Sequence, residues 1–236
     1  MKQIIHRAND RGFASHGWLQ SYHSFSFADY WNPEKIQFGM LRVLNDDVVK
    51  PGMGFGTHGH DNMEIVSIPL SGSLAHKDST GTAEIIRTHD VQIMSAGTGI
   101  RHSEFNASDK ENVNFLQIWI YPKEKNIKPR YDQKTYRPED RINQLLPVVS
   151  PKQSAETLWI NQDAYFLLGN FEAGKNTSYT ISKPNNGVYL FVINGVVRVN
   201  GEILNKRDAS GIYETEKLDI SFLELSEILI IDVPMN

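Results

Sequence analysis

The chain has 236 residues and no cysteine, is 40% hydrophobic, and carries a formal net charge of −4 at pH 7. This length suits one large all-β domain or two domains of about 100 residues, either of which can bury a core. The composition excludes disulfides and thiolate chemistry, and without a basic stripe we expect no direct binding to DNA or RNA.

The N-terminal segment MKQIIHRANDRG lacks the apolar stretch of a signal peptide, and no later run approaches the roughly 18 apolar residues of a membrane span. We therefore expect a cytoplasmic protein without membrane contact. Next, aromatic and polar residues alternate in SYHSFSFADYW (21–31), as in a strand. Core packing is the expected role of these aromatic residues, and a pocket wall is the alternative.

Short alternating apolar runs follow, separated by Gly, Asn, Asp and Pro at intervals of roughly 8 to 12 residues. The runs are FGMLRVL, DDVVKPGMGFG, EIVSIPLSG, AEIIRTHD, VQIMSAGTG and VNFLQIWIYP. Such spacing is typical of a β-sandwich or barrel. No segment before about residue 135 has sustained helical periodicity, so we expect residues 1–135 to form one all-β domain.

The composition then changes, because residues 122–153 are charged and contain several prolines. A short helix is expected around PEDRINQLL within this segment. We place the interdomain linker at residues 136–153 and a second β-rich domain at residues 154–236.

The second β-rich block resembles a diverged copy of the first. EIVSIPLSG (64–72) parallels VYLFVING (188–195), and RTHDVQIM parallels NKRDASGIY, with Asp90 matched to Asp208. Two tandem β-barrels are the simplest interpretation. The alternative is chance, since strands that end in glycine turns resemble one another.

Two stretches of the first block carry candidate metal ligands. GFGTHGHDNME (54–64) holds His58 and His60, which project from the same face of a strand, and GTGIRHSEFN (97–106) repeats the spacing with His102 and Glu104. If both strands line one barrel, three imidazoles and one carboxylate converge. Nitrogen and oxygen ligands without sulfur suit one divalent transition metal ion, with Fe(II) favoured and Mn, Ni, Cu, Co or Zn as alternatives.

Strand spacing leaves the acidic ligand undecided, because Glu64 has the same parity as His60 and competes with Glu104 for this role. Arg101, of opposite parity to His102, is expected at the surface or in a salt bridge. The other histidines stand singly near turns or strand ends and are expected to be structural or solvated: His6, His16, His23, His76 and His89. Of these, His16 or His23 can approach the site.

The second block offers no comparable ligands, because no histidine follows residue 102. Where the repeat aligns with the candidate ligands, it has Ile181, Lys183, Ile220 and Phe222. We therefore expect the second barrel to bind no metal.

These motifs resemble a known family. The pair His58 and His60 and the stretch with Gly99, His102 and Asn106 are similar to the two cupin motifs. More narrowly, RANDRGFASHGWLQSYHSFSFADYWNP, THGHDNMEIVSIPLSGSLAHKDS and SAGTGIRHSEFN resemble the bacterial members of the pirin family. The likeness covers nearly all of the first 120 residues and, more loosely, the C-terminal half.

The resemblance implies a bicupin, with two jelly-roll-like β-barrels and metal bound only in the first. The glutamate at the position of Glu64 is usually no ligand in pirins, whose ligands match His58, His60, His102 and Glu104. This chain departs from the general cupin pattern in two places. Gly97 replaces an expected proline, which would loosen the turn, and the spacing from His60 to Glu64 is one residue shorter than in many cupin dioxygenases.

The resemblance also implies two functions, because some pirins are quercetin 2,3-dioxygenases and eukaryotic relatives are iron-dependent transcriptional co-regulators. The first hypothesis is a metal-dependent dioxygenase that opens a flavonol such as quercetin with O2, with Glu104 as acceptor of the substrate proton. The second is a non-enzymatic, metal-responsive module that binds a partner protein. An isomerase or sugar-binding cupin is a weaker third hypothesis, and the fold alone does not decide between them.

Overall fold

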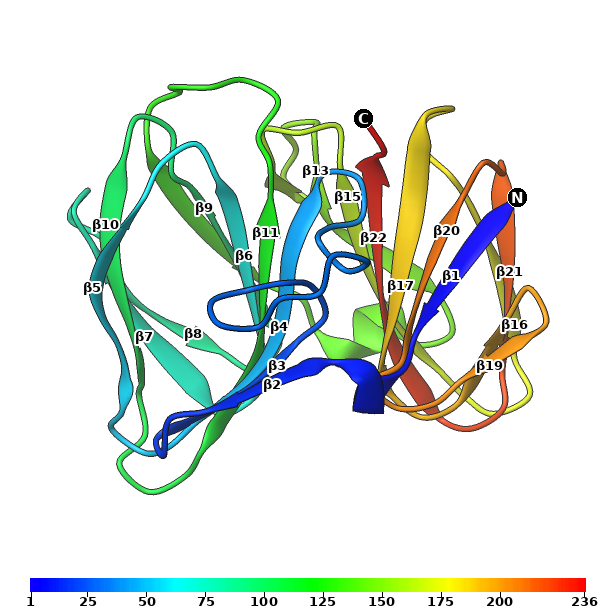
Figure 1. Ribbon diagram of the computed structural model, residues 1–236, viewed down its shortest axis with the longest axis horizontal. Coiled ribbons are helices and arrows are strands. Elements are labelled where there is room, and N and C mark those ends of the chain that lie inside the picture. The colour runs from blue at the N-terminus through cyan, green and yellow to red at the C-terminus, as the bar shows by residue number, and fades with distance from the viewer.

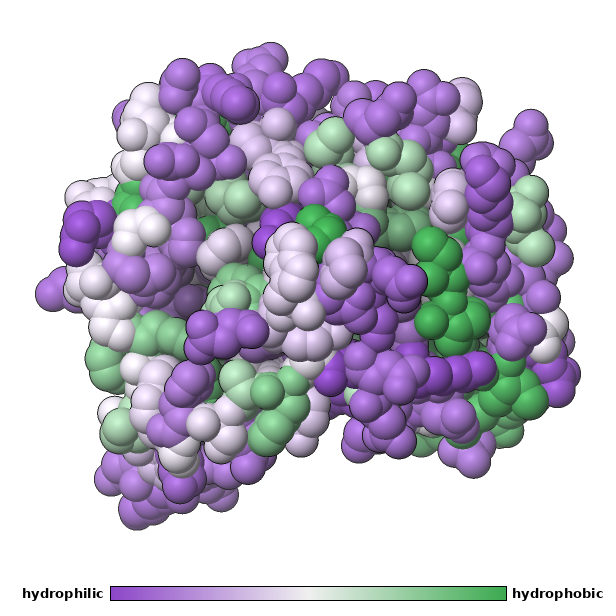
Figure 2. Space-filling model, in the orientation of Figure 1, coloured by the Kyte–Doolittle hydropathy of each residue, from purple (hydrophilic) through white to green (hydrophobic).

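The computed structural model describes residues 1–236, and apart from two short helical turns its regular elements are β-strands (Figure 1). The strands form two halves that stand side by side. The helical turns are the 3-10 segments η1 (Ala8–Asp10) and η2 (Pro138–Arg141). No helix has the length and apolar character needed to cross a membrane. Seen from the same side, the surface is mainly hydrophilic and is recessed over the first half (Figure 2).

The first half contains a seven-stranded and a four-stranded sheet. In spatial order, the larger sheet consists of β12 (Arg130–Thr135), β9 (Asp90–Ser95), β6 (Glu64–Ser71), β11 (Val113–Ile120), β4 (Leu41–Val49), β3 (Leu19–His23) and β2 (Gly12–Ser15). The smaller sheet consists of β5 (Gly54–His60), β10 (Ile100–Asn106), β7 (Ser73–Asp78) and β8 (Ala83–Arg87).

The second half repeats this arrangement, again with a seven-stranded and a four-stranded sheet. The larger sheet consists of β1 (Lys2–His6), β20 (Ala209–Tyr213), β17 (Asn186–Asn194), β22 (Ser226–Pro234), β15 (Tyr165–Phe171), β13 (Leu145–Ser150) and β14 (Leu158–Trp159). The smaller sheet consists of β16 (Asn176–Thr180), β21 (Lys217–Phe222), β18 (Val197–Val199) and β19 (Glu202–Leu204).

The internal repeat extends to single residues. β6 lies between β9 and β11, and its counterpart β17 lies between β20 and β22. Asp90 accepts a hydrogen bond from the backbone N–H of Arg87 at 2.7 Å, and Asp208 accepts one from Asn205 at 3.0 Å, three residues earlier in both cases. The predicted pair of jelly-roll-like β domains is therefore confirmed, with paired sheets rather than continuously closed barrels.

Strand pairing crosses the domain boundaries expected from the sequence. Lys2–His6, from the expected first domain, pairs with β20 in the second half, and Leu145–Ser150, from the expected linker, pairs with β15. The helix expected around PEDRINQLL is only the single turn η2, followed by a strand. Pro147 and the β-branched Val148 and Val149 explain this difference, since they disfavour a continued helix and favour a strand.

The two larger sheets pack against each other. The core between them contains 26 buried residues, among them Val66 and Ile68 of β6 and Tyr189 and Phe191 of β17. Each Å² of apolar surface that is buried stabilises the fold by about 25 cal/mol, so this contact is a main source of stability. The two halves therefore share one large core rather than meeting at a thin interface.

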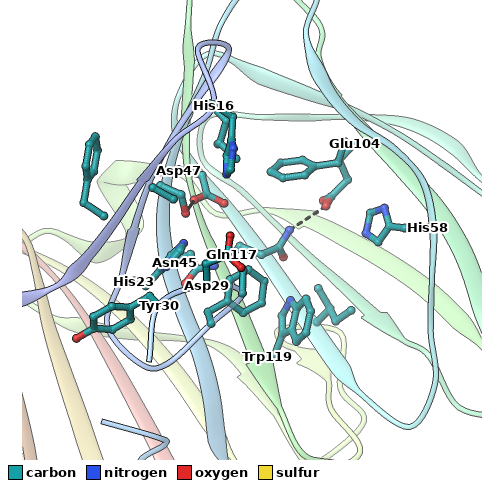
Figure 3. Close-up of a pocket in the computed structure, with 18 of the residues that line it drawn as sticks. His16, His23, Asp29, Tyr30, Asn45, Asp47, His58, Glu104, Gln117 and Trp119 are labelled. Atoms are coloured by element: carbon teal, nitrogen blue, oxygen red, sulfur yellow. Dashed lines mark hydrogen bonds between the residues drawn. The ribbon is translucent and has the colours of Figure 1, made fainter. Parts of the chain in front are cut away.

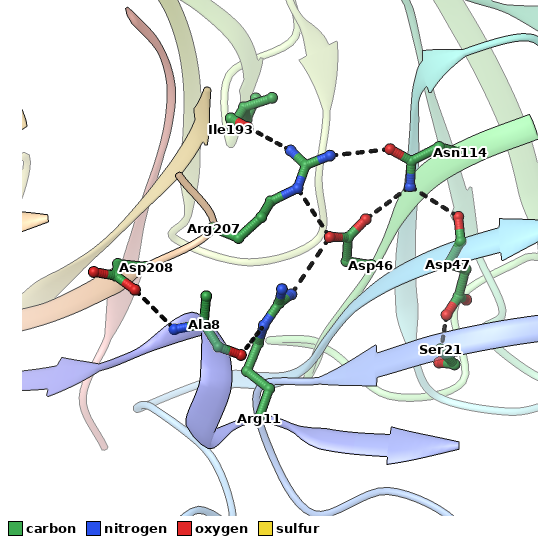
Figure 4. A network of polar contacts seen from close by, with 9 residues as sticks. All are labelled: Ala8, Arg11, Ser21, Asp46, Asp47, Asn114, Ile193, Arg207 and Asp208. Atoms are coloured by element: carbon green, nitrogen blue, oxygen red, sulfur yellow. Dashed lines mark hydrogen bonds and ion pairs between the residues drawn. The ribbon is translucent and has the colours of Figure 1, made fainter. Parts of the chain in front are cut away.

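A polar network also joins the halves and centres on Asp46 of β4 (Figure 4). One oxygen of Asp46 accepts from Nε of Arg207 at 3.0 Å and from Nη1 of Arg11 at 3.5 Å. The other accepts from Nδ2 of Asn114 at 2.7 Å, and Oδ1 of Asn114 accepts from Nη2 of Arg207 at 3.0 Å. The next residue, Asp47, points to the opposite face of the sheet. The network around Asp46 therefore holds β4, the strand that carries Asp47, in place.

Candidate metal centre

Two neighbouring antiparallel strands, β5 and β10, bring three histidines together. Strand register sets His102 opposite His58 and Ile100 opposite His60. The ring centroids are 4.9 Å apart for His58 and His60, 4.4 Å for His58 and His102, and 5.0 Å for His60 and His102. One ligand nitrogen from each of the three lies within 4.8 Å of the others, which is close enough for all to bind a single ion.

The chemical state of these imidazoles fits a metal. Nδ1 of His58 lies 2.8 Å from the carbonyl oxygen of Gly56 and donates to it, which leaves Nε2 with a free lone pair. His102 is only 2% exposed, and neither of its ring nitrogens has a hydrogen-bond partner. Burial, with repulsion from His58, lowers the pKa of His60 to about 4 and of His102 to about 3. Both rings are therefore neutral and able to coordinate at neutral pH.

Glu104 lies on the same strand as His102 and is also buried. Its Oε1 accepts a hydrogen bond from Oγ of Ser67 at 3.2 Å, and its Oε2 accepts one from Nε2 of Gln117 at 2.8 Å. Burial raises the pKa of Glu104 to about 7, although these hydrogen bonds oppose the shift. A second close group of potential ligand atoms comprises His76, His102 and Glu104, so the carboxylate borders the three-histidine set through His102.

His76 lies nearer this centre than its isolated place in the sequence indicates. Its Nε2 is 3.0 Å from Oδ2 of the buried Asp78, and its Nδ1 is buried without a partner. Its ring lies 5.3 Å from that of His102 and 4.7 Å from that of Tyr131. His76 is thus a buried, hydrogen-bonded residue that lies next to His102.

The structure separates Glu64 from the histidines. Its Oε2 accepts hydrogen bonds from Oγ of Ser95 at 2.8 Å and from the backbone N–H of Asn161 at 3.2 Å, on the side of the second half. A loop divides β5 from β6, and in it Asn62 has a positive φ of 44°. Parity counted from His60 does not continue across this loop, and Glu64 belongs to neither close group of ligand atoms.

A cavity of about 720 Å³ opens beside the three histidines and Glu104 (Figure 3). His16 and His23 both line it, as the sequence allowed. The remaining walls include a set of aromatic side chains: Phe13, Trp18, Phe27, Tyr30, Phe55 and Trp119. The pocket-wall role thus holds for two aromatics of the 21–31 stretch, whereas Phe25 packs in the core between the halves.

Sequence reasoning missed three polar residues of this cavity, Asn45, Asp47 and Gln117, on β4 and β11. Oδ1 of Asp47 accepts a hydrogen bond from Oγ of Ser21, and burial raises the pKa of Asp47 to about 7. The available signal was polar residues inside apolar strands, namely the NDD of LRVLNDDVV and the single Gln of VNFLQIWI.

The turn before β10 requires glycine at position 97. Gly97 has φ of 49°, and a Cβ there would lie 2.0 Å from the carbonyl oxygen of Ile127. The glycine therefore permits a tight contact, and the expected loosening of the turn is wrong. Arg101 is exposed, as expected, and the amide of Asn106 donates to the carbonyl oxygens of Val49 at 3.0 Å and Glu111 at 2.7 Å.

The matching positions of the second half have other roles. Ile181, Ile220 and Phe222 are buried in its apolar core, where Phe222 stacks on Phe171 with ring centroids 3.9 Å apart. Lys183 forms an ion pair with Asp163 at 2.8 Å. Apolar side chains fill the space that corresponds to the candidate metal centre of the first half.

Comparisons with known proteins agree with this architecture. Residues 6–120 match the family model of pirin, and residues 147–233 match the quercetinase C-terminal cupin domain. A quercetin 2,3-dioxygenase of Escherichia coli (strain K12) is 40% identical over 230 residues, 98% of each chain. A pirin-like protein of Caulobacter vibrioides is 40% identical over 222 residues, 94% of this chain and 95% of that one. The crystal structure of the bacterial pirin YhhW from Escherichia coli in complex with nickel(II) is 38% identical, with a TM-score of 0.93 over 99% of both chains. The chain belongs to the pirin family, and both of its halves are cupin domains.

Proposed function

We propose that this pirin is a metal-dependent dioxygenase that opens a flavonol such as quercetin with O2. One observation carries the proposal: three imidazoles converge on one wall of a cavity of about 720 Å³ whose other walls combine six aromatic side chains with a few polar ones. A planar aromatic chelator fits such a site better than a sugar, which needs many polar partners. The name of the Escherichia coli relative, quercetin 2,3-dioxygenase, supports the same reaction.

His58, His60 and His102 would hold a divalent ion, with Glu104 as the fourth ligand. Fe(II) is the ion we favour because the donor set combines imidazoles with a carboxylate. The nickel(II) complex of a related pirin supports a divalent ion of this class. Such an ion, when bound, supplies a Lewis acid and a template for the enol oxygen and O2.

The aromatic walls would orient the substrate and exclude water. Trp119 makes edge contacts with Phe27, at a centroid distance of 5.4 Å, and with His60, at 4.9 Å. A flat ring that lies against these groups would be held by apolar contact next to the imidazoles. Water leaves the site as such a ring enters, which strengthens the polar interactions that remain.

Glu104 would accept the substrate proton. The enol O–H bond would break, and a carboxylate oxygen of Glu104 would take the proton. In the metal-free protein, burial raises the pKa of Glu104 to about 7, and a buried carboxylate that is not bound to a cation takes up a proton readily. Ser67 and Gln117 hold its two oxygens, and so they fix where the proton goes.

Oxygen consumption with quercetin tests the proposal. Protein loaded in turn with Fe(II), Mn, Ni, Cu or Co is expected to take up O2 and release carbon monoxide, and a His58→Ala/His60→Ala protein is expected to do neither. His89→Asn, which removes a histidine outside the cavity and tolerates its positive φ of 76°, should retain full activity. No turnover above the double variant with any metal would overturn the proposal. Metal-dependent capture of a partner protein without oxygen uptake would instead support the regulatory module.

A further inference from the structure

A row of polar side chains crosses the inner face of the larger sheet in the first half. Strand register places His23 beside Asn45, Asn45 beside Gln117, Gln117 beside Ser67, and Ser67 beside Gln92. The row spans five neighbouring strands, and none of the five residues is more than 8% exposed. Buried polar groups are normally hydrogen-bonded, so each unpaired member needs a physical explanation.

The members of this polar row differ in their partners. Ser67 Oγ lies 3.1 Å from Oε1 of Gln117, and both side chains also bond Glu104. In contrast, Nδ1 of His23 and Oδ1 of Asn45 are buried without any partner, although both residues line the cavity. Each unpaired group costs roughly 1–3 kcal/mol. Both atoms are shielded from solvent, so a rotation of the Asn45 amide or the His23 ring is needed to turn them toward a ligand in the cavity, which would then recover part of this cost.

The row leads away from the three histidines. Figure 3 shows His23, Asn45, Gln117 and Glu104 in succession toward His58, in agreement with the strand register. Because neighbouring strands lie about 4.8 Å apart, Asn45 is about 5 Å and His23 about 10 Å beyond Gln117. A planar ligand that chelates at the histidines can therefore reach both residues with its remote ring.

We propose that Asn45 and His23 form a second subsite, which binds phenolic hydroxyl groups on the substrate ring remote from the chelating oxygens. The inference rests on the proposed flavonol site and specifies the substrate class as polyhydroxylated flavonols. An amide and a neutral imidazole each offer a donor and an acceptor, as a phenolic hydroxyl does. The rings of Phe27 and Tyr30 lie 5.3 and 6.2 Å from that of His23, so an aromatic ring has apolar neighbours there.

The neutral state of His23 agrees with this role. Burial, with a smaller contribution from His16, lowers the pKa of His23 below its ordinary value. A neutral ring can accept a hydrogen bond from a phenol as well as donate one, whereas an imidazolium only donates.

Binding of two flavonols to metal-loaded protein without oxygen tests the subsite. Quercetin carries hydroxyls on both outer ring systems, whereas 3-hydroxyflavone carries only the chelating one. Wild-type protein should bind quercetin more tightly, by roughly three- to tenfold for each hydrogen bond gained. Asn45→Leu should lose roughly three- to tenfold of this preference and bind 3-hydroxyflavone as wild type does. His23→Phe, as a second variant, should lose a comparable share.

Gln92→Leu is the matched control. Gln92 belongs to the same polar row, is 1% exposed and has an unpaired Nε2, but it does not line the cavity. Its replacement should leave both dissociation constants unchanged. Neither leucine variant should unfold more readily than wild type, because neither removes a partner from another buried group.

Four results would overturn the inference. A full quercetin preference in both Asn45→Leu and His23→Phe would exclude contact with remote hydroxyls. Equal loss of both ligands in these variants would assign a structural role to the two residues. Equal affinity of wild type for both ligands would remove the subsite but leave the flavonol site standing. If wild type binds neither ligand, the proposed flavonol function fails, and the subsite fails with it.

Discussion

The two halves of the molecule have the same strand order and different interiors. In the second half, 15 buried apolar residues form one continuous cluster. In the first half, the apolar residues between the sheets form clusters of 6 and 4, and a cavity of about 720 Å³ lies beside them. We expect the second half and the shared core of 26 residues to provide the stability that allows the first half to keep buried imidazoles, carboxyls and unpaired amides. The duplicated fold thus has an apolar core in one half and a polar cavity in the other.

The largest expected effect comes from removing a large side chain from the apolar core of the second half. Phe222→Ala removes a ring that is 1% exposed and stacked on Phe171, so it should cost about 3–5 kcal/mol in the free energy of unfolding. Urea denaturation measures this change, and metal content at saturation should stay at the wild-type level in the folded variant. A loss below about 1 kcal/mol would mean that the second half does not carry the stability assigned to it.

A second expected effect concerns Glu64, which lies where the two halves meet. Burial raises its pKa from 4.5 to about 7, so the folded protein retains a proton that the unfolded chain releases. This group therefore lowers stability as pH rises from about 4.5 to 7, and its effect is constant above that range. The free energy of unfolding of Glu64→Gln should exceed that of wild type by at most about 3 kcal/mol at pH 8 and equal it near pH 4. Parallel stability curves across this range would contradict the buried environment of Glu64.

Metal should stabilise the protein through the first half alone, which carries the three histidines. Nickel(II) at about 100 times its dissociation constant should add about 2.7 kcal/mol to wild type and raise Tm. His102→Ala removes the residue shared by both close groups of ligand atoms and should abolish this rise. A Phe222→Ala protein, although less stable, should show the same increment as wild type. An equal increment in His102→Ala would place the ion elsewhere.

The smallest expected effect separates the two glutamates of the first half. Glu104→Gln should weaken metal binding by roughly tenfold or more, because a carboxylate next to His102 becomes a neutral amide. Glu64→Gln should leave the metal affinity unchanged, since its side chain bonds Ser95 and Asn161 instead. Metal content after dialysis against a weak chelator measures both. Loss of metal from Glu64→Gln alone would reverse the assignment.

The sequence predicted what depends on near neighbours. The spacing of His58 and His60 places both on one strand face, and the repeat around Asp90 and Asp208 predicts the duplicated fold. Parity failed at Glu64, because the turn at Asn62 ends one strand before the next begins.

Contacts between distant strands were harder to predict. Asn45 and Gln117 come from strands of the larger sheet and meet the histidine strands only across the cavity. The pairing of β1 with the second half is likewise a nonlocal contact without a local signal. Hydrophobic patterning reports the face of a strand, but not which strand it opposes.

The pairing of β1 with β20 also affects how the chain folds. His6 pairs with Ala209, so the second sheet is completed by a strand that lies about 200 positions before its partner in the chain. Closure of so long a loop slows folding, and until it occurs β20 presents an open edge to other chains. Truncation of the first six residues would therefore leave the histidine strands β5 and β10 in place and make β20, instead of the short β1, the edge at which another chain could pair.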